Sequence, residues 1–371
     1  MAKRSFSLPL TIFACIIALI IGAVAGFLGW TIYKNPHGGD VYVSGDLKIH
    51  FLELGNNYTG DSVYIKAGNT DVLIDAGSRK NSAKAITEYV NQFCDDGILE
   101  YVIATHAHQD HIAGFVGTKE IPGIFDAYEC QTIIDFSKTN VTSDVYSGYL
   151  EKRSAEIDDG ATHYTALQCW KETDGAKRVY ELSNGIELEI LYNKFYETET
   201  SDENDYSVCV MINQGDKHFL FTGDLEHEGE EELVKNNQLP KVEVFKAGHH
   251  GSGTSSSKTL LDVIDPEIIC ICCCAGSVEY TQDLNNAFPY QAVIDRMAQY
   301  TDKVYATTAG QIEYSTEKGK YVDVGFSSLN GNIVVTSNKK GVTVDCSYDD
   351  NILKNTTWFK ENRTTPTEWL S

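Results

Sequence analysis

The sequence predicts an α/β fold, because strand-type apolar runs alternate with segments of helical spacing. The runs at 71–75 and 217–222 are each followed by an amphipathic stretch, at 82–93 and 226–235. With 371 residues, 42% of them hydrophobic, the chain is long enough to bury a substantial core. One layered α/β domain can use most of this length.

Residues 47–105 are predicted to form strands and one helix. Three strands are expected at 47–54, 62–67 and 71–75, separated by turn-type residues. A helix follows at 82–93, where Ile86, Val90 and Phe93 fall on one stripe, and then a strand at 100–105. Residues 112–180 show a weaker hydrophobic pattern. There we expect a loop and strand over 120–134 and a helix over 143–157.

The second half predicts a hairpin and a further series of strands and helices. Ser183-Asn184-Gly185 is typical of a hairpin turn. One of the serines at 255–257 is expected to cap the helix that follows. The predicted strands are 179–182, 186–192, 207–213, 217–222, 242–247, 266–274, 304–308, 311–315, 332–336 and 341–346, and the helices are 226–235, 258–264 and 289–300.

The N-terminus predicts a membrane anchor. Lys3 and Arg4 precede an uncharged, mostly apolar stretch over 5–33, which is long enough to span a bilayer as one helix. The charges place the N-terminus inside and the rest outside the cell membrane. Ala23-Val24-Ala25 resembles a signal-peptidase site, so a cleaved and secreted protein is the alternative. The predicted domains are a cytoplasmic stub and transmembrane anchor over 1–34, a linker over 35–46, a folded domain over 47–346 and a C-terminal tail over 347–371.

The hexapeptide His106-Ala107-His108-Gln109-Asp110-His111 places four potential metal ligands directly after a strand. Imidazole nitrogen and carboxylate oxygen suit zinc or another borderline divalent ion. His106 and His108 project the same way if the strand continues, and the turn brings Asp110 and His111 toward a second point. The spacing therefore suggests two metals.

This HxHxDH pattern resembles the metallo-β-lactamase superfamily. The strand ending in Asp75-Ala76-Gly77, the strand ending in Gly223-Asp224 and the strand ending at His249 stand in the order that this superfamily shows. The resemblance covers roughly residues 47 to 345. It implies a four-layer αββα sandwich with the site where strand ends meet.

Within the superfamily, the chain resembles the extracellular hydrolase domain of the ComEC/Rec2 competence proteins. The segments that carry this resemblance are 49–55, 60–62, 204–208 and Gly-His-His-Gly-Ser at 248–252. Where that subgroup usually has Tyr-Gly-His-Pro, this chain has Asn286-Ala287-Phe288-Pro289. We expect a stand-alone, membrane-tethered relative without the channel-forming helices.

The resemblance implies a role for each matched residue. His106 and His108 would bind one of two divalent metals, most simply zinc, Asp110, His111 and His249 would bind the other, and Asp224 would bridge them. Asp110 and Asp224 would also serve catalysis, Asp75 would hold a ligand histidine, and Ser252 would lie on the substrate side.

Two assignments stay open at this point. Many superfamily members supply a third histidine to the first metal, and here the interval offers only His163 and His218, both in unconvincing contexts, so Asn204, Asp205 or water is the alternative. His250 either replaces His249 as ligand or donates a proton to the leaving group.

The charge and cysteine content of the chain limit the partners and ligands that can be expected. A net charge of −23 disfavours, without excluding, a nucleic-acid substrate, because it repels the phosphate backbone at long range. The cysteines at 270 and 272–274 lack paired metal-binding spacing and are interpreted as small buried side chains. No protein partner follows from the sequence.

The expected function is a membrane-anchored, extracytoplasmic metal-dependent hydrolase that acts on a phosphoester. A phosphodiesterase is favoured, with a nucleic acid or a cell-wall phosphodiester as substrate. Hydrolysis of a β-lactam, lactone or other amide or ester is the enzymatic alternative. A non-enzymatic surface binding protein on the same scaffold is the third.

Overall fold

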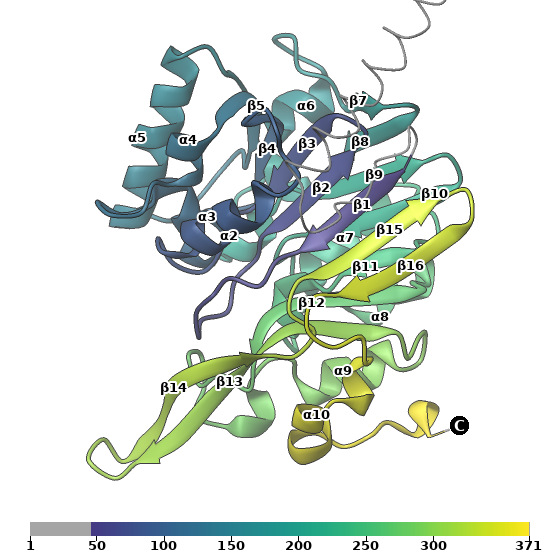
Figure 1. Cartoon of the computed structure of the whole chain (residues 1–371). Coiled ribbons are helices and arrows are strands. Elements are labelled where there is room, and N and C mark those ends of the chain that lie inside the picture. The colour runs from purple at the N-terminus through teal and green to yellow at the C-terminus, as the bar shows by residue number, and fades with distance from the viewer. Residues whose placement is uncertain (1–45, 371) are drawn as a thin grey trace, which may run out of the picture. The chain divides into compact units, whose positions relative to one another are not determined.

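Two eight-stranded β-sheets pack against each other in the computed structural model, which describes residues 46–370 (Figure 1). Apolar side chains of both sheets form one core, in which the rings of Phe51 and Phe221 stack 6.2 Å apart. The first sheet has the order β16-β15-β1-β2-β3-β4-β5-β6. Its strands are β1 Leu47–Phe51, β2 Val63–Ala67, β3 Thr70–Ile74, β4 Ile98–Ala104, β5 Glu129–Asp135, β6 Thr162–Thr165, β15 Ile333–Asn338 and β16 Gly341–Cys346.

The second sheet has the order β14-β13-β12-β11-β10-β9-β8-β7. In each sheet a run of parallel strands lies beside antiparallel ones: β3 to β6 are parallel in the first sheet and β10 to β13 in the second. The strands of the second sheet are β7 Val179–Ser183, β8 Ile186–Ile190, β9 Val210–Gln214, β10 Lys217–Phe221, β11 Val244–Lys246, β12 Ile268–Ala275, β13 Val304–Ser315 and β14 Lys320–Ser328.

Helices cover the outer faces of the sheets through their apolar stripes. Leu233 of α7 and Leu260 of α8 bury against the second sheet, while Ile86 of α2 and Phe115 of α3 join the core of the first. Ser257 caps α8 by accepting a hydrogen bond from the Leu260 amide, so the predicted serine cap is confirmed. The helices are α2 Ser82–Val90, α3 Gln109–Val116, α4 Ile124–Ala127, α5 Asp144–Asp158, α6 Ala166–Lys171, α7 His227–Asn236, α8 Lys258–Ile264, α9 Gln291–Met297 and α10 Thr357–Asn362.

The α/β sandwich predicted from the sequence is therefore observed, although β6 and the helices α3, α4, α6 and α10 were not predicted. The two strands expected at 304–308 and 311–315 are one strand, β13, and it continues through Gly310 with a register shift between Gln311 and Ile312. Its partner β14 was not predicted. The Figure 1 view shows β13 and β14 as a long hairpin that extends beyond the sheet.

The structure describes the C-terminal segment up to residue 370 but not residues 1–45. The predicted stub, membrane segment and linker lie outside the described residues, and no helix within 46–370 is long and apolar enough to cross a bilayer. At the other end, Leu353, Phe359 and Trp369 are buried against β12, β13 and α9. The segment predicted as a tail therefore contributes to the core.

Candidate metal centre

The residues of the hexapeptide and its partners follow the carboxyl ends of parallel strands from both sheets. Asp75 follows β3, residues 106–111 follow β4, Asp224 follows β10 and His250 follows β11. In α/β sheets the loops at these strand ends build the binding site, since strands that run in the same direction deliver their loops to the same edge.

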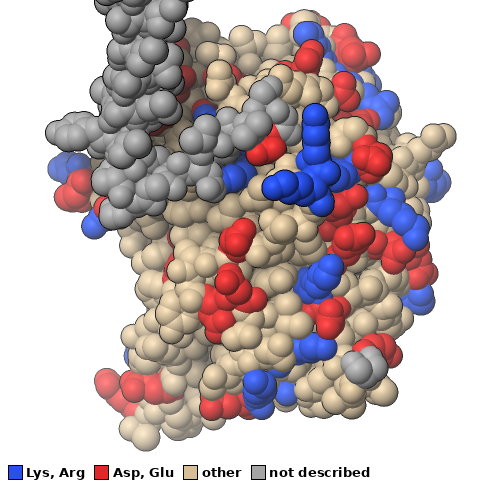
Figure 2. Space-filling view, turned by 45° about the vertical axis from the view of Figure 1, so that its right-hand side comes forward, with Lys and Arg blue, Asp and Glu red and all other residues tan. Residues whose placement is uncertain are grey.

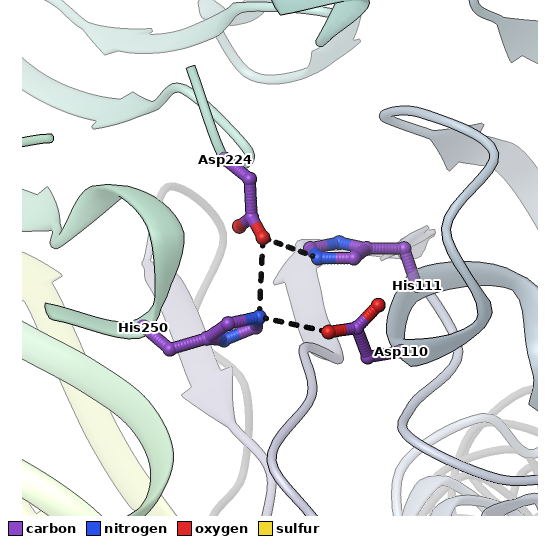
Figure 3. Close-up of side chains that lie close together, drawn as sticks. All are labelled: Asp110, His111, Asp224 and His250. Atoms are coloured by element: carbon purple, nitrogen blue, oxygen red, sulfur yellow. Dashed lines mark ion pairs between the residues drawn. The ribbon is translucent and has the colours of Figure 1, made fainter. Parts of the chain in front are cut away.

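Four side chains converge into one group: Asp110, His111, Asp224 and His250 (Figure 3). The Nε2 atoms of His111 and His250 lie 3.0 and 3.2 Å from Oδ2 of Asp224. The same His250 nitrogen lies 3.5 Å from Oδ2 of Asp110. Both imidazoles and Asp224 are almost completely buried, so their polar atoms depend on one another or on an ion.

The charges of the metal-free group balance through protonation. Burial opposes charge on His111 and His250, but the Asp224 carboxylate and its acidic neighbours outweigh it and raise the pKa of both rings well above the usual value. Burial likewise opposes charge on Asp224, yet the two histidines hold its pKa well below the usual range. Loading a cation would displace the two protons, because ligand imidazoles are neutral.

Asp75 fixes the orientation of His111. Its Oδ2 lies 2.7 Å from Nδ1 of His111, and its carboxylate also accepts hydrogen bonds from the amide and hydroxyl of Thr105, both at 2.8 Å. This leaves Nε2 of His111 to face Asp224. Asp75 has a left-handed backbone with φ of 59°, which is uncommon for a residue other than glycine.

The structure brings His250, rather than His249, into the central group. Nδ1 of His250 lies 2.9 Å from the carbonyl oxygen of Cys272 and 3.1 Å from Asp61, which directs Nε2 inward. His249 instead lies with Nδ1 3.1 Å from Glu226, and its Nε2 is 4.0 Å from Asp224. Both histidines have left-handed backbones, with φ of 45° and 54°, so the turn aims consecutive side chains in different directions.

His106 and His108 form a second pair beside this group. Nε2 of His106 lies 3.0 Å from Nδ1 of His108, and the rings of His106 and His111 are 4.1 Å apart. Burial, together with the nearby His111, lowers the pKa of His106 well below its usual value, so its imidazole is neutral and suited to bind a metal.

Neither candidate for a third histidine joins that pair. His163 Nε2 lies 2.8 Å from Asp135, and His218 Nδ1 lies 2.7 Å from Asn213 in the second sheet.

The remaining predicted residues border the centre. Asn204 donates to Glu226 at 3.2 Å, and Asp205 accepts a hydrogen bond from the amide of that glutamate. The Ser252 hydroxyl lies 3.0 Å from the hydroxyl of Thr254, which in turn donates to Glu226 at 2.8 Å. These hydrogen bonds connect Asn204 and Asp205 directly to Glu226, and Ser252 to it through Thr254.

Three residues of the site were not identified from the sequence. Lys246, at the end of β11, forms a buried ion pair with Asp61 and lies 3.9 Å from Oδ1 of Asp224. Tyr280 donates a hydrogen bond to Oδ2 of Asp110 at 2.8 Å. No local pattern marks the lysine or the tyrosine. Asp61 lies in the Gly-Asp-Ser stretch at 60–62, which is part of the resemblance to the competence proteins. That resemblance was the one sequence feature that could have indicated Asp61 as a site residue.

The donor set fits a divalent cation. Nε2 of His111, Nε2 of His250 and Oδ1 of Asp224 are buried and lack a partner in hydrogen-bonding geometry within residues 46–370. Buried polar atoms are rarely left in this state, and ligand atoms that point to a common centre are one physical reason for it. Two imidazoles with two carboxylates suit zinc and similar ions.

Curated proteins similar to this chain are bacterial competence and recombination proteins. Competence protein ComA of Neisseria gonorrhoeae is 27% identical over 264 residues, which are 70% of this chain and 31% of that protein. Recombination protein 2 of Haemophilus influenzae is 26% identical over 268 residues, or 71% and 28% of the two chains. ComE operon protein 3 of Bacillus subtilis is 25% identical over 296 residues, or 73% and 33%. The chain thus spans about a third of the length of these relatives.

Solved structures with a similar backbone arrangement include the metallo-beta-lactamase fold protein YhfI from Bacillus subtilis. Its TM-score is 0.40 at 9% identity, over 70% of this chain and 95% of that one. Human tRNase Z, short form, gives 0.32 at 12% identity, over 61% and 92%.

The resemblance to the ComEC/Rec2 competence proteins is confirmed by these curated relatives. A family description adds a second assignment. Residues 51–246, which are more than half of the chain and include the hexapeptide and Asp224, match the family described as Anti-Pycsar protein Apyc1. The chain belongs to this Anti-Pycsar protein Apyc1 family.

Proposed function

We propose that this protein is a metal-dependent hydrolase of phosphoesters, with phosphodiesters as the favoured substrates and two divalent ions, most simply zinc, as cofactor. The convergence of His111, His250 and Asp224 carries the proposal. Their side chains are buried, both histidine Nε2 atoms lie within 3.2 Å of Oδ2 of Asp224, and Asp110 completes the group.

We assign His250 to the metal, in the place that the sequence analysis gave to His249. His250 is fully buried within the group, while the side chain of His249 is 22% exposed and bound to Glu226. His106 and His108 are proposed to hold the second ion.

When bound, the ions would polarise a water and neutralise charge that develops on the substrate. The chain's own residues prepare that centre. Asp75 fixes His111 in one orientation, and Asp61 and the Cys272 carbonyl fix His250. The buried ammonium of Lys246 offsets part of the negative charge around Asp224.

The phosphoester choice is supported by the similarity to competence and recombination proteins, and it does not follow from the ligand set alone. The net charge of −23 weighs against a long anionic polymer. On the face drawn in Figure 2, acidic and basic side chains are intermingled among uncharged ones. A cell-wall phosphodiester or another small phosphodiester is therefore proposed ahead of nucleic acid.

The test is metal content and hydrolysis of bis(p-nitrophenyl) phosphate by the wild type beside His108→Ala, Asp224→Ala and His250→Ala. We expect the wild type to bind two ions per chain and each substitution to lower both metal content and turnover. His249→Ala should retain more metal than His250→Ala, and His227→Ala, an exposed histidine on α7, is the matched control.

The outcomes separate the alternatives. Full metal occupancy with hydrolysis of a chromogenic β-lactam, but not of the phosphodiester, would favour the carbonyl hydrolase. A wild type that binds no metal would favour a non-enzymatic binding protein.

We also propose that the hydrolase unit lies outside the cell membrane, anchored by residues 5–33. Protease added to intact cells should then remove the folded unit. Protection of the unit until the cells are lysed would argue for the opposite side, and release into the medium would indicate cleavage.

A further inference from the structure

The loop between β12 and α9, residues 276–290, leaves the second sheet and contacts elements of the first near the metal centre. Glu279 in this loop forms an ion pair with Arg79 at 2.5 Å and accepts a hydrogen bond from the Thr59 amide at 3.1 Å. The guanidinium of Arg79 also lies 3.8 Å from the centre of the Tyr58 ring. These contacts fix the start of the loop against the first sheet.

Two further elements hold the rest of the loop. Gln282 exchanges hydrogen bonds with the backbone of Tyr321 in β14, at 2.9 and 3.2 Å. Arg363, which follows α10, donates to the carbonyl oxygens of Ala287 and Pro289 at 2.7 and 3.0 Å. The loop is thus tied to the first sheet, to β14 and to the C-terminal segment, so its side chains have defined positions.

Tyr280 is the residue of this loop that reaches the centre. Its hydroxyl donates to Oδ2 of Asp110 at 2.8 Å, the same oxygen that lies 3.5 Å from Nε2 of His250. The ring lies 5.5 Å from that of Phe288, which itself packs against His249 and His250 at 5.7 and 6.0 Å. Yet Tyr280 is 54% exposed. It therefore stands between the buried ligands and solvent, where a substrate must approach.

The cations around the centre are already engaged. Lys246 is buried in an ion pair with Asp61, and Arg79 is paired with Glu279. A phosphoryl group that enters beside Asp110 thus meets a hydroxyl that is neutral, mobile about one bond and able to redirect its hydrogen bond.

We propose that Tyr280 is a substrate-facing residue: its hydroxyl donates a hydrogen bond to a phosphoryl oxygen of the bound phosphoester, and its ring, with Phe288, forms one wall of the entrance. This inference rests on the proposed function, since it names the group that the hydroxyl contacts. Asp110 receives the same hydrogen bond when no substrate is present.

The test uses inorganic phosphate as the probe and the metal-loaded full chain. Phosphate binding is measured by calorimetry, and bound metal by elemental analysis, for the wild type, Tyr280→Phe and Tyr348→Phe. Tyr348 is a 70% exposed tyrosine after β16, and its substitution controls for the loss of a surface hydroxyl. We expect Tyr280→Phe to weaken phosphate binding roughly tenfold with unchanged metal content, as a hydrogen bond to a charged acceptor predicts, and Tyr348→Phe to match the wild type.

Equal phosphate affinity in Tyr280→Phe and the wild type would overturn the inference, and so would a wild type that binds no phosphate. Loss of metal together with phosphate would also overturn it, because Tyr280 would then act by holding Asp110. Hydrolysis of bis(p-nitrophenyl) phosphate by the same samples tests the proposed function separately. A wild type that binds phosphate through Tyr280 but hydrolyses no phosphodiester would refute only the proposed function.

Discussion

His50 makes the stability of the fold sensitive to mild acid. It lies in β1, is 1% exposed, and is surrounded by the rings of Tyr64, Tyr89 and Phe93 at 4.7 to 5.6 Å. Nδ1 lies 2.9 Å from the Tyr89 hydroxyl, whereas Nε2 has no hydrogen-bond partner within residues 46–370. Burial, and to a smaller extent Lys48, lowers its pKa from 6.5 to about 3.

The sign and size of the effect follow from proton linkage. Between pH 6.5 and 3 the unfolded chain protonates this histidine and the folded chain does not, so unfolding takes up a proton and stability falls as pH decreases. The difference between the two pKa values lowers the free energy of unfolding by roughly 5 kcal/mol once the pH is below both values. At pH 5 the loss is about 2 kcal/mol.

His50→Phe removes this linkage and keeps a ring in the site. We expect the wild type to lose about 2 kcal/mol more than the variant between pH 8 and pH 5. The measurement is urea unfolding with a metal chelator present, because metal binding itself depends on pH and would stabilise the folded chain. Tyr89→Phe removes the hydroxyl contact but leaves the titration, so it should keep the wild-type slope. Parallel pH profiles for wild type and His50→Phe would refute the reasoning.

Three further substitutions test other parts of the structure by denaturant unfolding. Gly114→Ala places a methyl group against the carbonyl oxygen of Ala76, so we expect a loss of about 3 kcal/mol, and unchanged stability would show that α3 shifts freely. Glu230→Gln leaves one oxygen where the carboxylate accepts the Ser256 and Ser257 amides, each at 2.6 Å. The expected loss is about 2 kcal/mol, and a change below about 0.5 kcal/mol would contradict it. Lys246→Met removes the ammonium partner of buried Asp61, which keeps its contact with His250 at 3.1 Å, and should cost about 3 kcal/mol in the metal-free protein. Adding Asp61→Asn should recover part of this loss, and no recovery would mean that the lysine acts mainly on Asp224.

Much of the fold could be predicted because its strands are short, apolar and bounded by turn residues. The predicted helix over 258–264 coincides with α8, since a serine cap and an apolar stripe define both its start and its length. The hairpin of β13 and β14 was missed for the opposite reason. Residues 320–328 of β14 are intermediate or exposed and lack the apolar run that signals a buried strand.

The site could be predicted as far as its ligands lie in one motif or directly after a strand. His106, His108, Asp110 and His111 are adjacent in sequence, and Asp224 follows a strand. The choice between His249 and His250 depends on two left-handed residues, and no spacing rule gives the direction in which each side chain then points. Lys246 and Tyr280 act through contacts with residues far away in the sequence, which a single sequence does not reveal.

The place of β15 and β16 in the first sheet has a consequence for biosynthesis. β1, the first described strand, pairs on one side with β2 and on the other with β15, which the ribosome produces more than 280 residues later. One edge of β1 therefore stays open until residues 333–338 have been synthesised, and an open edge is a template for pairing with another chain. A nascent or truncated polypeptide that lacks the last strands would already contain every residue of the proposed metal centre and still present that edge to its neighbours.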